Sequence, residues 1–242
     1  MDSEKIRLIE EKNQLIVKSN DLILKTHYNL TLVEMKLVSY LISKIVADDK
    51  EIKTVNISIK DFCHLTNIEP KGNNYEAIRN SIKSLKTKSW WIMLDDNTEL
   101  LYSWLDYAII KKNTGNIEIC LSKSLTPFLV QLRSRYTKYT LAEILKLKSR
   151  AAVRLFEICQ SQLYKGFFVI DIDQFKKLLD IKDKYNDYRD LRKRIIEPSI
   201  KEINDLTYIS VSYEPIKEGK KITKLRFTVN EAMGYQLSLL DE

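Results

Sequence analysis

Basic side chains are concentrated in one short stretch of the sequence. Arg189, Arg192, Lys193 and Arg194 fall within six consecutive positions. An arginine guanidinium can donate two parallel hydrogen bonds to the O6 and N7 atoms of guanine, and a lysine ammonium neutralises phosphate. These residue types therefore favour a surface that binds double-stranded DNA. The alternative is a solvated helix face whose charges pair with one another, which is the commoner arrangement for a single charged helix.

The residue types that most metal sites and catalytic centres need are scarce. The chain has three cysteines, Cys63, Cys120 and Cys159, in no CxxC pair, and two histidines, His27 and His64, in no metal-binding spacing. No GxxxxGK[ST] phosphate-binding loop occurs. We therefore expect no catalytic residue, no metal and no cofactor, and we expect the cysteines to fill the core in a reducing compartment.

The basic stretch belongs to a segment with helical periodicity, residues 187–205. One side of this helix should pack against the core, namely Tyr188, Leu191, Ile195, Ser199, Ile203 and Leu206. The other side should face away, namely Asn186, Asp190, Lys193, Arg194, Glu197 and Lys201, with Arg189 and Arg192 at the borders. Pro198 lacks a backbone N–H, so we expect a kink or break there. Residues 187–197 are then the part that would enter a DNA groove.

An internal repeat organises the chain. Residues 57–68 match residues 170–181, and the match continues without a gap at a constant offset, so that Tyr75 and Arg79 face Tyr188 and Arg192. In each copy a helix comes first, at 31–47 or 149–164, and Thr31 with Glu34 predicts a capping box for the first of them. A short strand follows at 55–59 or 168–172, and Asp61 or Asp173 should open a short helix. A longer helix, 74–86 or 187–205, then precedes a β-rich hairpin.

This order of elements describes a winged helix, in which a β-hairpin beside the recognition helix forms the wing. We therefore predict an α+β protein with two tandem winged-helix domains. The expected boundaries are a helical extension at 1–15, a first domain at 16–132, a second domain at 133–230 and a tail at 231–242. Residues 89–121 suggest one three-stranded sheet, in which the tryptophans Trp90, Trp91 and Trp104 are read as sheet core rather than base-stacking platforms.

Further candidate DNA contacts surround the second domain's long helix. A basic run extends from Arg133 to Arg154, and a basic turn, KEGKK, connects the last two strands at 217–221. Lysines at a hairpin also protect a sheet edge, so the turn alone is weak evidence. Beyond the four residues above, the candidates in the second copy are Lys201, Lys217, Lys220, Lys221, Lys224 and Arg150. The less basic first copy offers Asn74, Tyr75, Arg79, Lys83 and Lys86.

Composition fits a folded protein that meets a polyanion. The chain of 242 residues carries 40 Lys and Arg against 33 Asp and Glu, a formal net charge of +7. No segment approaches the roughly 20 apolar residues of a membrane span, and the N-terminus lacks the apolar stretch of a signal peptide. We expect a cytoplasmic protein with no membrane partner.

Four segments resemble the plasmid replication initiator (Rep) family of theta-replicating, iteron-bearing plasmids. They are LTLVEMKLVSYLIS, YEAIRNSIKSLKTKSWWI, LKSRAAVRLFEIC and, most specifically, YRDLRKRIIEPSIKEINDLTYISVSYEPIKEGKKITKLRF. The resemblance implies a tandem winged-helix protein that binds direct repeats at an origin and promotes opening of an adjacent A+T-rich region. It also implies contacts with a host initiator and a replicative helicase, and repression of the protein's own gene by dimers bound to an inverted repeat.

By the same resemblance, the second domain makes the dominant DNA contact, and the first adds contacts and forms the homodimer, with the sheet around 104–121 as the expected interface. Two alternatives remain. A rolling-circle initiator would nick DNA through a tyrosine, and is disfavoured because its His-hydrophobe-His metal ligands are missing. A winged-helix transcription regulator without a replication role reads DNA through the same helix, so the residues do not separate it from an initiator.

Overall fold

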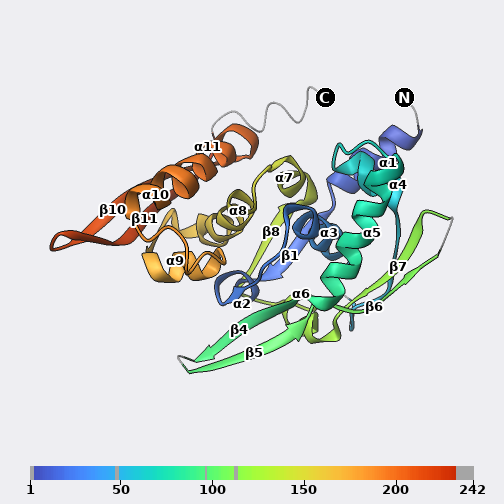
Figure 1. Ribbon diagram of the computed structural model, residues 1–242, viewed down its shortest axis with the longest axis horizontal. Helices are drawn as coiled ribbons and strands as arrows, with labels where there is room; N and C mark the ends of the chain where they lie inside the picture. The colour runs from blue at the N-terminus through green and yellow to red at the C-terminus, as the bar shows by residue number, and fades with distance from the viewer. Residues whose placement is uncertain (1–2, 47–48, 96, 112–113, 233–242) are drawn as a thin grey trace. The chain divides into compact units, whose positions relative to one another are not determined.

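The computed structural model describes residues 3–46, 49–95, 97–111 and 114–232 (Figure 1). The chain divides into two compact units, and the boundary along the chain falls between Leu145 and Lys146. The sequence placed this boundary at 132/133. The later boundary arises because β8 (Tyr136–Thr140) pairs antiparallel with β1 (Leu15–Ser19), which ties residues 136–140 to the first unit.

The first unit begins with two helices and two short strands that precede helix α3 (Leu32–Ser43) in the chain. They are α1 (Ser3–Lys12), β1, α2 (Asn20–Leu24) and β2 (Thr26–His27). The next elements are β3 (Val55–Ser58), α4 (Ile59–Leu65), α5 (Gly72–Thr87), β4 (Ser89–Asp95), β5 (Thr98–Ser103), β6 (Leu105–Ile110) and β7 (Asn116–Leu121). A 3₁₀ turn (Lys123–Leu125), α6 (Thr126–Leu129), β8 and α7 (Leu141–Lys146) complete it. Its fully buried side chains include Leu37, Leu41, Phe62, Ile82 and Trp90.

Helix α3 carries the predicted capping box. The Thr31 hydroxyl accepts from the Glu34 N–H, and the Glu34 carboxylate accepts from the Thr31 N–H. The helix ends at Ser43, earlier than the expected 47, and residues 47–48 lie outside the described part of the chain. The two short helices begin at Ile59 and Ile172, before Asp61 and Asp173, because Ser58 and Asp171 occupy the extended N-cap positions.

The prediction of a single three-stranded sheet over residues 89–121 is wrong. Strands β4 and β5 join β2 in one sheet, in the order β2-β4-β5, whereas β6 and β7 join β3 in another, in the order β3-β7-β6. The break falls at Trp104, which is 2% exposed and packs edge-on to Tyr28 at 5.0 Å between ring centroids. Burial of this large side chain turns the continuous apolar run into two strands.

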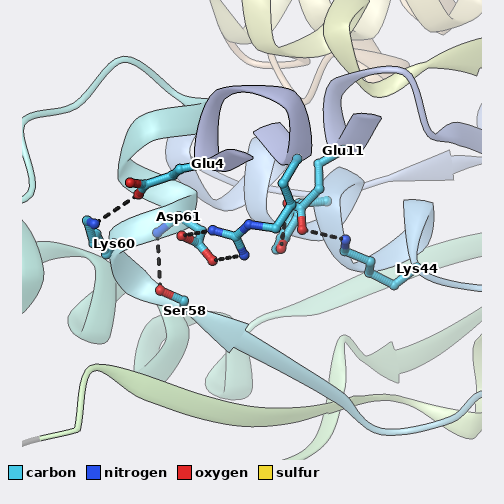
Figure 2. Close-up of polar contacts among 8 residues, drawn as sticks. Glu4, Glu11, Lys44, Ser58, Lys60 and Asp61 are labelled. Atoms are coloured by element: carbon cyan, nitrogen blue, oxygen red, sulfur yellow. Dashed lines mark hydrogen bonds and ion pairs between the residues drawn. The ribbon is translucent and has the colours of Figure 1, made fainter. Parts of the chain in front are cut away.

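Helix α1 is held to the first unit by charged contacts (Figure 2). The Arg7 guanidinium donates to both carboxylate oxygens of Asp61, at 2.8 and 2.7 Å, and Lys60 donates to Glu4 at 2.9 Å. None of the helix residues is buried. Residues 3–12 of the expected extension therefore pack against α4 while keeping their own side chains at least partly solvated, whereas Leu15 already belongs to β1 and residues 1–2 lie outside the described part of the chain.

The second unit has the predicted winged-helix order. It comprises α8 (Arg150–Gln162), a 3₁₀ turn (Leu163–Lys165), β9 (Phe167–Asp171) and α9 (Ile172–Leu178). A long helical segment follows, made of α10 (Tyr188–Leu191), a π-helical turn (Arg192–Ile196) and α11 (Glu197–Leu206), and the hairpin β10 (Ile209–Glu218) and β11 (Lys221–Glu231) ends it. The sheet order is β10-β11-β9, and Phe156, Phe175 and Phe227 lie fully buried in its core.

The two copies share helix, strand, helix, helix and hairpin, but the hairpin that corresponds to the wing differs in place. In the second unit β11 pairs with β9, and in the first unit β7 pairs with β3 in the same way. The first unit's counterpart of the wing is therefore β6–β7, and β4–β5 is an additional hairpin between it and α5. Among the described residues, no helix is long and apolar enough to cross a bilayer.

Candidate nucleic-acid interface

The candidate recognition helix contains a π-helical turn, hereafter the π turn, at Arg192–Ile196. The Glu197 N–H donates to the carbonyl of Arg192, five residues back. Pro198 follows in the first turn of α11. In a regular α-helix it would leave the carbonyl of Arg194 without a backbone N–H donor, and its ring would clash with that carbonyl. The helical segment therefore continues through Pro198, and the expected kink or break takes the form of a widened turn just before it.

The π turn changes which residues face the core. The buried residues are Leu191, Ile196, Ser199 and Ile203. Ile195, which the regular wheel placed inside, is only partly buried, as are Tyr188 and Leu206. The assignment of Ile195 to the core is corrected to Ile196, because a π turn adds one residue between successive inward positions.

The predicted outward face is exposed in full. Its cations differ in their partners: Arg192 Nε lies 3.5 Å from Glu197, and Arg194 Nε lies 3.6 Å from Asp190. Over the described part of the chain, neither Arg189 nor Lys193 forms an ion pair. Lys201, about two turns after Arg194, lies 2.5 Å from Asp205 and is 76% exposed. The face thus combines three cations that lie beside carboxylates, Arg192, Arg194 and Lys201, with two that have no ion pair among the described residues.

The β10–β11 hairpin forms the wing and runs alongside this helix (Figure 1). Glu218 pairs with Lys221, so the turn itself is only Gly219-Lys220, with a positive φ of 63° at Gly219 that favours glycine. Lys217, Lys220 and Lys221 are exposed and have no ion pair among residues 3–46, 49–95, 97–111 and 114–232. Lys224 instead lies 3.1 Å from Glu218, whose pKa it lowers through a hydrogen bond and its charge.

Two contacts that the sequence did not reveal fix the helix in place. The Asn204 side chain bonds to the backbone of Val211 in β10, and the Glu202 carboxylate accepts hydrogen bonds from the N–H groups of Lys148 and Ser149 at the start of α8. Both residues lie in the EIN part of the Rep-like segment, which is the only sequence signal that marks them. They set the orientation of α11 against α8 and against the wing.

The predicted basic run from 133 to 154 is not one surface. Arg154 is 4% exposed, and its guanidinium lies 2.8 Å from the Glu157 carboxylate. Arg150 lies 3.8 Å from Asp180 and is partly exposed. Arg154 is therefore a core residue, and Arg150 stays available at the start of α8.

The first-copy candidates lie on α5, and most of their polar side chains have partners within the first unit. Arg79 and Lys83 approach Glu76 at 3.7 and 3.8 Å, and Asn74 donates to the carbonyl of Glu69. Tyr75 is partly buried. Lys86 donates to the carbonyls of Leu105 and Asp106 at 3.0 and 2.9 Å, so its ammonium group holds the start of β6.

Two of the three tryptophans lie in the core of the first unit. Trp90 and Trp104 are buried, as the core interpretation predicts, whereas Trp91 is 38% exposed and stacks on His27 at 5.9 Å. Within the described residues, no three His, Cys, Asp or Glu side chains are grouped so that they could hold a metal ion.

The family models agree with this architecture. The model of the initiator replication protein WH1 domain matches residues 15–160, and that of the initiator Rep protein WH2 domain matches residues 171–229. The chain belongs to the replication initiator (Rep) protein family. The initiator thus carries both winged helices of its family in tandem, as the internal repeat predicted.

Individual relatives agree with the family assignment. A replication initiation protein of Escherichia coli is 25% identical over 228 residues, covering 90% of this initiator and 69% of the relative. The Pi initiator protein, solved in complex with iteron DNA, superposes with a TM-score of 0.74 at 22% identity, covering 90% of this chain and 97% of the other. Domains 2 and 3 of RctB give a TM-score of 0.51 at 12% identity, covering 83% and 80%. These two structures support the fold.

Proposed function

We propose that this initiator starts plasmid replication by binding directly repeated origin sequences, iterons, chiefly through its second winged helix. The observation that carries the proposal is the pair of exposed basic elements in one unit, the π turn with Arg192, Lys193 and Arg194, and the wing with its turn lysines. The similar Pi initiator, which was solved with iteron DNA, supports the choice of repeat as ligand.

Each basic residue has a proposed role that follows from its surroundings. Arg189, Arg192, Lys193 and Arg194 enter the major groove, where guanidinium groups read guanine edges. Lys201, Lys217, Lys220, Lys221, Lys224 and Arg150 neutralise phosphates beside it. In the first unit, Asn74, Tyr75, Arg79 and Lys83 add weaker contacts. We remove Lys86 from this set, since its ammonium group is bound to two backbone carbonyls.

The wider role follows from the family resemblance. We propose that bound protein promotes opening of an A+T-rich segment and brings the host initiator and replicative helicase to it, without a bond-breaking step of its own. We also propose that dimers, formed through the first unit, repress the initiator's own gene. The exposed Tyr107 and Ile109 on β6, an edge strand, support that dimer surface, whereas Trp104 is buried and cannot take part. An Ile109→Glu variant that stays dimeric by light scattering would contradict the assignment.

Binding to duplexes carrying the direct repeats of the plasmid origin tests the central claim. Fluorescence anisotropy over a range of salt concentrations should give a steep loss of affinity with salt, by a slope of about −0.9 for each phosphate contact. Lys220→Ala should reduce the magnitude of that slope by about 0.9, the value of one phosphate contact. Arg192→Ala should reduce the difference in binding free energy between the repeat and a scrambled repeat by about 1–3 kcal/mol. Lys165→Ala, at an exposed position in the 3₁₀ turn before β9, is the matched control. Equal binding of repeat and scrambled DNA would overturn the proposal.

A plasmid-maintenance experiment separates an initiator from a regulator of the same fold. A plasmid carrying this coding region and its flanking repeats should be maintained in a host that cannot otherwise replicate it. The Arg192→Ala variant should abolish maintenance at equal protein level. Repeat binding without maintenance would favour a transcription regulator.

A further inference from the structure

The internal repeat provides a reference for the candidate recognition helix. In the first unit, α5 is an uninterrupted α-helix whose buried positions are Ile78, Ile82 and Leu85, spaced by four and three residues. The corresponding buried positions in the second unit are Leu191, Ile196 and Ser199, spaced by five and three. Although the two copies match without a gap, the second therefore has one additional residue between its first two buried positions, because Ile196 is buried in place of Ile195, and the π turn is where this residue is accommodated.

This additional residue changes how the cations are presented. In an α-helix successive side chains are about 100° apart, so the third residue after an inward-facing Leu191 would lie only about 60° from the direction of that leucine, nearer to the buried side than it lies in the widened turn. That residue is Arg194. In the π turn the return to the core is delayed to Ile196, and the Arg194 side chain is 68% exposed. Arg192, Lys193 and Arg194 consequently face solvent as one block.

Local contacts keep the widened turn in this form. Glu197 closes it through its N–H to the carbonyl of Arg192, and its carboxylate lies 3.5 Å from the Arg192 Nε. Pro198 provides no N–H for the carbonyl of Arg194, which removes one of the bonds that would stabilise a regular α-helix there. Leu191 before the cations and Ile196 after them are both fully buried, and they fix which side of the helix faces the core at each end of the π turn.

We propose that the π turn is the element that determines DNA sequence specificity, because it presents three consecutive cations to the bases together. This inference rests on the proposed function, since it assumes that the helix enters DNA. The first unit's α5, with regular spacing, presents no such block and contributes non-specific contacts. Sequence discrimination, rather than affinity for duplex DNA in general, depends on the additional residue. π-Helical turns are rare and frequently occur at functional sites, which agrees with this role.

Deleting Ile195 tests the proposal directly. The deletion restores the four-residue spacing of α5 while keeping Leu191, Ile196 and every cation. Ile195→Ala is the matched control, since it removes the same side chain but keeps the chain length. Wild type and both variants are each used to select from a duplex pool with a randomised core, and then titrated with the selected duplex and with the unselected pool.

We expect wild type and Ile195→Ala to enrich the same sequence, and the deletion to lose about tenfold or more of the discrimination between selected and unselected duplex. Its affinity for the unselected pool should stay within about twofold, because the phosphate contacts remain. Unchanged discrimination in the folded deletion variant would overturn the inference alone. Failure of wild type to enrich any sequence would instead contradict the proposed function.

A second variant keeps the test open if the deletion does not fold, as judged by circular dichroism. The Ile196→Ala and Pro198→Ala double variant keeps the chain length, restores the missing N–H and leaves Ile195 as the apolar side chain at α-helical spacing from Leu191. It should lose discrimination in the same way. Selection of the wild-type sequence with wild-type discrimination by this variant would also overturn the inference.

Discussion

The side chain of Asn204 pairs with both backbone groups of Val211. Its Nδ2 donates to the Val211 carbonyl at 2.9 Å, and its Oδ1 accepts from the Val211 N–H at 2.7 Å. The amide thus forms with β10 the two bonds that a neighbouring strand would form. Because Asn204 lies on α11 and Val211 near the start of the wing, this pair couples the position of the wing to the candidate recognition helix.

Asn204→Ala should both destabilise the protein and weaken DNA binding. The substitution leaves the buried backbone of Val211 without its partner, which costs about 1–3 kcal/mol. Urea denaturation followed by circular dichroism measures the loss, and anisotropy with repeat DNA should show weaker binding because the wing is no longer fixed. Asn230→Ala, an exposed asparagine of β11, is the control. If the two variants unfold at the same urea concentration, the Asn204–Val211 pair does not contribute to the free energy of unfolding.

Much of this arrangement could be predicted from the sequence. The capping box of Thr31 and Glu34 is confirmed, since both partners are identifiable from residue types three positions apart. The outward position of Lys193 and Arg194 is also confirmed, because helical periodicity and charge agree there. Local chemistry and periodicity were sufficient for these features.

The π turn could not be predicted because two isoleucines are adjacent. Ile195 satisfies regular spacing from Leu191, and Ile196 satisfies the widened spacing, so the apolar pattern fits both. Which isoleucine is buried depends on packing against the rest of the unit and on Pro198. The two sheets of the first unit were missed for a similar reason, since only tertiary packing reveals that Trp104 interrupts the strand pattern.

Arg154 should behave as a core residue despite its place in a basic run. Its Nε donates to the carbonyl of Leu178 at 3.2 Å, and its guanidinium pairs with the buried Glu157. Arg154→Ala removes this cation from a buried carboxylate, and we expect a loss of about 3–5 kcal/mol in the free energy of unfolding. Chemical denaturation measures it, with the exposed Arg133→Ala as control. A loss as small as that of Arg133→Ala would show that burial of this pair is not maintained in solution.

Helix α1 should loosen from its N-terminal end when its central ion pair is removed. Asp61→Asn keeps the shape of the side chain but loses the charge that attracts Arg7, and the pair of Glu4 with Lys60 is too exposed to compensate (Figure 2). The largely buried pair of Glu11 with Lys44 holds only the C-terminal end of the helix. Hydrogen exchange of the α1 amides should accelerate, and more so at high salt. Exposed Glu10→Gln, on the same helix, should leave exchange unchanged. Slow exchange in Asp61→Asn would mean that apolar contacts hold the helix instead.

The buried carboxylate of Glu34 should make the first unit sensitive to acid. Burial acts to raise its pKa, but hydrogen bonds from the Lys88 ammonium, at 2.6 Å, and from the Thr31 N–H outweigh burial and hold the pKa below the usual 4.5. A carboxyl group with a lowered folded-state pKa stabilises the protein above its unfolded-state pKa. That contribution disappears as the pH falls through the folded-state value.

Glu34→Gln tests this dependence. At neutral pH we expect the variant to be less stable by about 2–3 kcal/mol, since Lys88 and the N-cap lose a charged acceptor. The difference from wild type should shrink as the pH falls below 4.5, because wild-type Glu34 becomes protonated there and resembles glutamine. Urea denaturation at a series of pH values measures both quantities, and exposed Glu51→Gln should change neither. A difference that stays constant down to the acid transition would show that the charge of Glu34 is not what stabilises the start of α3.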